Sequence, residues 1–84
     1  MIWDELDAVI ALADDSDRWI DDNGNEHWLT DELSAVFDKH DDISDYNVDS
    51  TTAFESCGLT AGVISIAWVQ QGELYTLNFE WRET

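Results

Sequence analysis

The sequence predicts an α+β fold: two short helices and an antiparallel β-sheet that includes a C-terminal hairpin. Three observations predict it. Apolar residues recur at helical spacing in residues 2–14 and 31–40. Large apolar side chains alternate with smaller or polar ones in residues 63–70 and 73–82, on either side of a Gln-Gly dipeptide. Hydrophobic residues make up 44% of the 84 residues, which is enough for a folded core despite a net charge of −17.

The first helix is predicted over residues 2–14. Its apolar positions recur with the period of a helix and are Ile2, Leu6, Val9, Ile10 and Ala13, with Trp3 beside them. Three acidic residues fall in the first turns, where the helix dipole favours negative charge. The acidic run Asp14, Asp15 and Asp17 is predicted to end the helix.

Residues 18–29 predict a β-hairpin. Asn23-Gly24 is a strong signal for a two-residue turn, because both positions tolerate positive φ. A turn centred there sets the cross-strand pairs, which are Ile20 with His27, Trp19 with Trp28, and Asp21 with Glu26. The two tryptophans would then share one face, and the pair of like charges would cost some stability.

A second helix is predicted over residues 31–40, with Thr30 as its N-cap. Its apolar stripe consists of Leu33, Val36, Phe37 and, at the end, His40. The following segment, residues 41–50, is acidic and is predicted to be irregular, anchored by Ile43, Tyr46 and Val48.

The C-terminal hairpin has the best-defined register. A two-residue turn at Gln71-Gly72 brings the large residues onto one face, because it pairs Trp68 with Tyr75, Ile66 with Leu77, Ile64 with Phe79, and Gly62 with Trp81. The opposite face is only partly polar, so another part of the protein or a partner could cover some of it. Residues 52–57 are a candidate third strand, ended by Gly58.

The composition excludes several classes of protein. The length favours one domain, residues 1–84. Three Lys and Arg cannot neutralise the phosphates of a nucleic acid or bind an anionic membrane surface. No apolar run is long enough to span a bilayer, and the N-terminus lacks the basic segment of a signal peptide. A single Cys favours a reducing compartment, so a cytoplasmic location is expected, in a host cell if a phage encodes the protein.

The sequence predicts no enzyme, no cofactor and no metal site. When the D-D-N-G run is aligned with an EF-hand loop, Trp19 and Thr30 fall where the first and last carboxylate ligands are required. His27, His40 and Cys57 are too scattered for a zinc site. No catalytic signature surrounds Cys57, so its thiol is predicted to be buried and inert near a strand end.

The five Trp residues divide into two groups. Trp68 and Trp81 lie on the apolar face of the C-terminal hairpin and are predicted to be core residues. Trp19 and Trp28 lie among charged residues, where an exposed pair that contacts a partner is as well supported as a buried one.

The charge itself is the strongest functional signal. Asp and Glu total 20 and Lys and Arg total 3, and 16 of the acids lie in residues 1–49. A compact chain of this length is about 30 Å across by size scaling, so its net charge corresponds to about one per 1.8 Å. Duplex DNA carries one charge per roughly 1.7 Å of its axis.

The acidic side chains are therefore predicted to form a row of negative points that binds a basic partner. Carboxylates three or four residues apart on a helix, or two apart on a strand, lie about 5–6 Å apart. The predicted partner-binding residues are Asp4, Asp7, Asp14, Asp15, Asp17, Asp21, Asp22, Glu26, Asp38, Asp41, Asp42, Asp45, Asp49 and Glu55.

In length, charge and α/β pattern the whole chain resembles the acidic nucleic-acid-mimic inhibitors of phages and mobile elements. These include anti-restriction proteins, anti-CRISPR proteins and the uracil-DNA glycosylase inhibitor. The last presents a Glu-Ser pair on a strand at the DNA-binding face of its enzyme, and Glu55-Ser56 is such a pair here. In that family the strand lies between the two helices, whereas residues 55–56 follow the second predicted helix.

The resemblance implies an inhibitor that binds the basic nucleic-acid-binding surface of a DNA- or RNA-processing protein. It implies no direct contact with nucleic acid, and it leaves both a monomer and a homodimer open. Two other interpretations fit the same composition. One is a small acidic domain adapted to a high-salt cytoplasm. The other is an immunity protein that neutralises a nuclease toxin, since such proteins are similar in size and charge.

Overall fold

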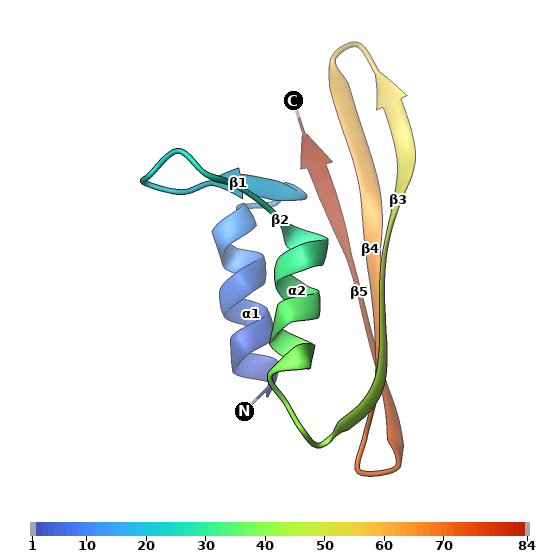
Figure 1. Cartoon of the computed structure of the whole chain (residues 1–84). Helices are drawn as coiled ribbons and strands as arrows, with labels where there is room; N and C mark the ends of the chain where they lie inside the picture. Colours follow the sequence, from blue (N-terminus) through green and yellow to red (C-terminus); the bar gives the residue numbers. More distant parts are fainter. Residues whose placement is uncertain (1, 84) are drawn as a thin grey trace.

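The computed structural model describes residues 2–83, which form two helices and five strands (Figure 1). In chain order these are α1 (Ile2–Ala13), β1 (Arg18–Ile20), β2 (Glu26–Trp28), α2 (Leu29–Asp38), β3 (Ile43–Ser56), β4 (Leu59–Gln70) and β5 (Glu73–Glu83). β1 and β2 form a two-stranded antiparallel sheet, and β3, β4 and β5 form a three-stranded antiparallel sheet in that order. The predicted α+β class with its C-terminal hairpin is confirmed.

The two helices lie side by side on one face of the three-stranded sheet (Figure 1). The β1–β2 hairpin lies at the end where α1 finishes and α2 begins, and the turn between β3 and β4 projects beyond the helices. The molecule measures 44 × 31 × 15 Å along its principal axes. No helix among residues 2–83 combines the length and apolar character needed to cross a membrane.

The core lies between the helices and the sheet. Its most deeply buried side chains come from α1, α2 and β4, and they are Leu6, Leu29, Leu33, Phe37, Ile64, Ile66 and Trp68. Each Leu, Ile and Phe side chain among them contributes about 1.5–3 kcal/mol by leaving water. Trp68 and Trp81 are both buried, as predicted.

The predicted register of the C-terminal hairpin is confirmed. Trp68 pairs with Tyr75 and Gly62 pairs with Trp81. Gln71 and Gly72 have φ of 52° and 80°, the two positive values that a two-residue turn of type I′ requires. These turn angles match the right-handed twist of β4 and β5, so the turn and the buried face specify the same pairing.

The third strand is longer than predicted. Residues 41–50 were expected to be irregular and 52–57 to form a short strand, but β3 is continuous over 14 residues. The reason is that β4 offers a pairing partner along its whole length, with irregular register between Ile43 and Asp45 and between Thr52 and Phe54. The three predicted anchors in this segment do pack against the core; they are Ile43, Tyr46 and Val48.

The register of the first hairpin differs from the prediction by one residue. Trp19 pairs with His27, so the two tryptophans do not face each other, and Ile20, not Asp21, lies opposite Glu26. Residues 22–24 form a three-residue loop, because the amide of Asp21 donates to the carbonyl of Asn25. The carboxylate of Asp21 also accepts the amides of residues 23 and 25 at 2.9 Å, which stabilises the longer loop.

Helix α2 begins at Leu29, two residues before the predicted start, and the residue at the N-cap position is Trp28, with no side-chain cap. Leu29 is 1% exposed, so its burial favours the earlier start over the cap that Thr30 would have supplied. The prediction for Cys57 is also wrong: its thiol is exposed. Cys57 and Gly58 have φ of 53° and 81° and form the turn between β3 and β4, which projects beyond the helices in Figure 1.

Candidate functional site

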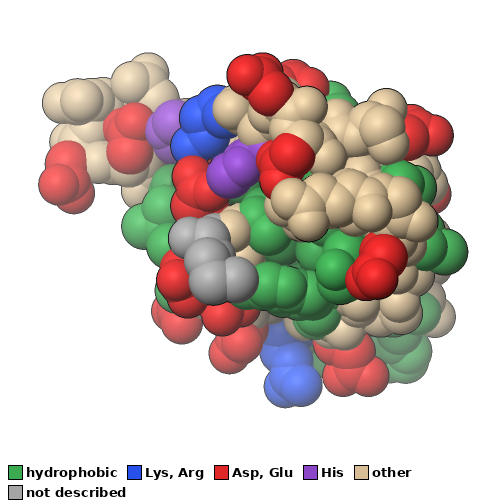
Figure 2. Space-filling view, turned by 90° about the horizontal axis from the view of Figure 1, so that it is seen from below, with side chains coloured by type: hydrophobic (Ala, Val, Ile, Leu, Met, Phe, Trp, Pro, Cys, Tyr) green, Lys and Arg blue, Asp and Glu red, His purple; other side chains and the backbone are tan. Residues whose placement is uncertain are grey.

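The predicted partner-binding acids lie in five separate places. They are on α1 (Asp4, Asp7), in the α1–β1 connection (Asp14, Asp15, Asp17), in the β1–β2 hairpin (Asp21, Asp22, Glu26), around the α2–β3 connection (Asp38, Asp41, Asp42, Asp45) and farther along β3 (Asp49, Glu55). Most are exposed. Figure 2, seen from the end where α1 begins, shows carboxylates spread around the molecule with apolar and polar side chains between them. The acids therefore surround the fold and do not form one straight row.

The α2–β3 connection gathers the densest group. Asp38, Asp41 and Asp45 line one surface hollow. The hydroxyl of Tyr46 donates to the carboxylate of Asp38 at 2.6 Å, and this negative neighbour raises the pKa of Tyr46. The side-chain amide of Gln70 donates to Asp42 at 2.5 Å, so the acidic connection is tied to the end of β4.

A second group lies at the opposite end of the helices. Asp14 and Asp15 both have positive φ, 48° and 69°, as the chain leaves α1. The carbonyl of Asp15 accepts the amide of Arg82 at 2.7 Å, which fixes this connection to β5. Asp14 and Asp15 line a hollow together with Arg82 and Glu83, so one cation is interspersed among these carboxylates.

Most of the basic groups form ion pairs within the molecule. The guanidinium of Arg18 pairs with Glu83 and lies 4.8 Å from the ring centroid of Trp28. The ammonium of Lys39 lies 3.2 Å from Glu5, which also contacts the ring of His40. Hydrogen bonds from these two groups lower the pKa of Glu5. These pairs join α1 to the residues that follow α2, and β1 to β5. The acids outnumber the Lys and Arg residues by 20 to 3, so the surface stays strongly negative.

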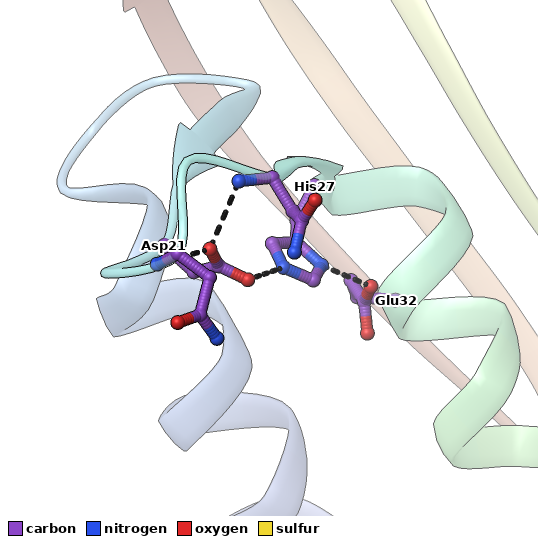
Figure 3. Close-up of polar contacts among 5 residues, drawn as sticks. Asp21, His27 and Glu32 are labelled. Carbon is purple, nitrogen blue, oxygen red and sulfur yellow. Dashed lines mark hydrogen bonds and ion pairs between the residues drawn. The ribbon is translucent and has the colours of Figure 1, made fainter.

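His27 lies between two carboxylates in the hairpin (Figure 3). Its Nε2 is 2.8 Å from Asp21 and its Nδ1 is 2.8 Å from Glu32 of α2. The hydrogen bond to Asp21, followed by the one to Glu32, raises the pKa of His27. The hydrogen bond between His27 and Asp21 is also the main cause that lowers the pKa of Asp21 to about 2. The imidazole also stacks on Trp19, with ring centroids 5.2 Å apart. Both ring nitrogens thus have protein partners, and within residues 2–83 no group of three His, Cys, Asp or Glu side chains is placed to hold a metal ion.

The face of the three-stranded sheet opposite the helices is uncovered in the described part of the chain. A shallow hollow on it has Ala67, Val69 and Leu74 among its lining residues, with Asp45 and Asn47 at the β3 side. Leu74 is 69% exposed. Sequence reasoning identified this face as partly apolar but did not name it as a site, and the alternation that places Leu74 opposite Val69 was the available signal.

Phe54, on β3 close to the projecting tip, is a further exposed apolar residue that sequence reasoning missed, with 53% of its surface accessible. Glu55 and Ser56 follow it and are both exposed. Trp28 is 40% exposed and Trp19 is half-buried, so these two tryptophans lie in different surroundings.

The density of charge is lower than the compact-chain estimate, because the molecule is elongated. A net charge of −17 along the 44 Å axis is about one charge per 2.6 Å. This value falls between roughly 1.7 Å for duplex DNA and roughly 3.4 Å for one of its strands. The protein therefore carries charge at the density of a nucleic acid.

Comparisons with protein-family models, with curated proteins and with solved structures gave no match. The charge and geometry of the protein are therefore the basis for a proposal about its function.

Proposed function

We propose that this protein is an acidic nucleic-acid mimic that inhibits a DNA- or RNA-processing protein by occupying its basic nucleic-acid-binding surface. Anti-CRISPR, anti-restriction and DNA-repair-inhibiting roles are the classes to which such an activity belongs. The observation that carries the proposal is a net charge of −17 on a small folded body in which Arg18 and Lys39 are held in internal ion pairs.

The physical basis is competition for the same cations. A groove that binds nucleic acid is lined with Lys and Arg, and its field attracts any dense array of negative charge. A folded protein presents that array without losing chain entropy on binding, so it can displace a flexible polyanion. Association is expected to be fast at low salt and to weaken as salt rises.

The test is capture of a target by the purified, tagged protein from a bacterial lysate at low salt, with elution by a salt step and identification by mass spectrometry. A polyglutamate peptide of the same net charge is the matched control. The expected result is one nucleic-acid-binding protein that is displaced by DNA or RNA and is not retained by polyglutamate. Recovery of the same mixture of basic proteins on both supports would contradict the proposal.

Nuclease assays on the captured protein, and folding measured against salt concentration, separate the alternatives. An immunity protein would retain a nuclease toxin. It would inhibit the nuclease activity of that toxin and of no other nuclease. A domain adapted to high salt would retain no particular protein and would require molar salt to fold.

A further inference from the structure

We propose that the free edge of β3 binds an extended basic segment of the partner as a fourth strand of the sheet. This inference rests on the proposed function for its expectation that the partner is basic. Strand addition gives affinity through main-chain hydrogen bonds, and alternate side chains give specificity. Strand addition would fix the position of the partner segment along β3, which charge attraction alone does not do.

The edge itself is long and open. β3 pairs with β4 on one side, and no strand in the described part of the chain, residues 2–83, lies on its other side. Every second residue of an edge strand directs its N–H and C=O outward. Along β3 the amide of Tyr46 donates to the carboxylate of its neighbour Asp45 at 2.9 Å, a local hydrogen bond that an added strand would have to replace. Between the two irregularities of register, residues 45–52 pair regularly with β4, which leaves a regular stretch long enough for a short strand to add.

The side chains along this stretch select for a basic partner. Asp45, Asn47 and Asp49 point to the uncovered face of the sheet, where the amide of Asn47 donates to Asp49 at 2.6 Å. Tyr46 and Val48 point to the opposite face and are half-buried against the core. β3 contains no Lys or Arg. An added strand should therefore carry cations on the side of Asp45 and Asp49 and apolar residues on the side of Tyr46 and Val48, because cross-strand neighbours lie about 4.5–5.5 Å apart.

A second copy of this chain fits the edge poorly. Self-pairing would bring rows of carboxylates together, and like charges opposite each other destabilise a strand pair. It would also join two molecules that each have a net charge of −17. Charged side chains and breaks in register are common devices that keep edge strands from pairing with themselves, and β3 has both. The same carboxylates favour a strand of opposite charge.

The direct test uses a seven-residue peptide probe with arginine at its second and sixth positions, valine at the third and fifth, and threonine elsewhere. This sequence is the same in both directions, so it is suited to either strand polarity. The matched control has the same residues in the order Arg-Arg-Val-Val-Thr-Thr-Thr, which keeps the charge and removes the alternation. Binding of the first peptide should be about tenfold tighter, and equal binding of the two peptides would overturn the proposal.

Hydrogen exchange locates the contact. The alternating peptide should slow exchange at every second amide of residues 45–52, which are the outward-facing ones, and should leave the helices unchanged. Protection spread over the helices or along β5 would overturn strand addition.

Two double variants with the same net charge test the role of the β3 carboxylates. Asp45→Asn with Asp49→Asn removes the two acids at the edge, whereas Asp31→Asn with Glu80→Gln removes one acid from α2 and one from the far edge strand, β5. The first pair should weaken binding of the alternating peptide about fivefold more than the second. Equal losses would show that only net charge matters and would overturn the proposal.

The failure of strand addition and the failure of the proposed function give different results. Suppose that a nucleic-acid-binding protein is captured but its complex shows no protection at β3; the mimic function then stands and strand addition is wrong. Suppose instead that the alternating peptide protects β3 but no nucleic-acid-binding protein is captured; the edge then binds basic strands and the proposed function is wrong.

Discussion

His27 holds the loop of the β1–β2 hairpin against the first turns of α2. Its ring contacts Asp21 in the hairpin loop and Glu32 in the first turns of the helix, each at 2.8 Å, and stacks on Trp19. A two-stranded hairpin alone is marginally stable in water. The charged form of His27 can donate to both carboxylates at once, so protonation should strengthen the attachment.

The ring of His27 should therefore titrate at a higher pH than an ordinary His. Its pKa is raised from 6.5 by hydrogen bonds to Asp21 and Glu32, and Glu32→Gln should lower it. A group whose pKa is higher in the folded state binds more protons when folded. Its stabilising effect is thus complete below about pH 6.5 and is lost as pH rises through the folded-state pKa. NMR titration of the imidazole in both proteins checks this, and an unchanged pKa in Glu32→Gln would show that the contact is absent in solution.

Gly62 is a position where only hydrogen fits. A Cβ atom there would lie 2.2 Å from the carbonyl oxygen of Thr51 and 2.6 Å from the ring of Trp81. Gly62→Ala should destabilise the fold by about 1–3 kcal/mol or more, because backbone and a buried indole would both have to move. Urea denaturation measures the loss. The control is Ser65→Ala, on the uncovered face of the same strand, which should change stability by less than about 0.5 kcal/mol. Comparable effects of the two substitutions would contradict the close approach at Gly62.

At the scale of elements, the turn between β4 and β5 has a residue that its geometry does not favour. Gln71 has φ of 52°, which is costly for most side chains but easily adopted by Asn. Gln71→Asn should stabilise the protein by about 0.5 kcal/mol, and Gln71→Val should destabilise it by about 1 kcal/mol because β-branched side chains are strained at positive φ. Thermal denaturation of both variants measures the effects. If Asn and Val shifted the midpoint in the same direction, the type I′ turn would be wrong.

The elements differ in how far the sequence determines them. The β4–β5 register was predictable because the alternate positions from Ile64 to Trp68 and from Tyr75 to Trp81 carry large apolar side chains, and a one-residue shift would expose all of them. β3 lacked that signal, since most of residues 43–56 are exposed and polar, and its strand conformation depends on pairing with β4. The first hairpin differed by one residue because the side chain of Asp21 accepts two loop amides, a local contact that turn statistics do not include.

The candidate site was predictable in its composition but not in its arrangement. Counting residues identified the excess of acids, and their exposure followed from their charge. Helix and loop orientation then placed Asp14 and Asp41 in groups at opposite ends of the helices, which spacing along the chain could not show. The uncovered sheet face and the free edge of β3 depend on the order of the strands in the sheet. The sequence does not specify that order, so only the structure shows these two features.

At the scale of the whole molecule, shape and charge act together. The thinnest dimension is 15 Å, so carboxylates on the helix side and on the uncovered sheet face are within about one or two screening lengths of each other at 0.1 M salt. A net charge of −17 on such a body repels itself in the folded state more than in the expanded unfolded chain. Stability should therefore depend on salt even with no partner present.

Salt distinguishes a nucleic-acid mimic from a domain adapted to high salt. The screening length falls from about 30 Å at 0.01 M to about 10 Å at 0.1 M and about 3 Å at 1 M. For a mimic, circular dichroism should show a folded protein at 0.01 M salt, and the urea midpoint should rise with salt, most steeply between 0.01 and 0.1 M. The variant Glu80→Gln removes one charge from an exposed residue of β5, so its midpoint should be higher at 0.01 M and should gain less from added salt. A chain that is unfolded at 0.01 M and folds only near 1 M would support high-salt adaptation. A midpoint that falls as salt is added would show that attractive pairs such as Arg18 with Glu83 outweigh the repulsion.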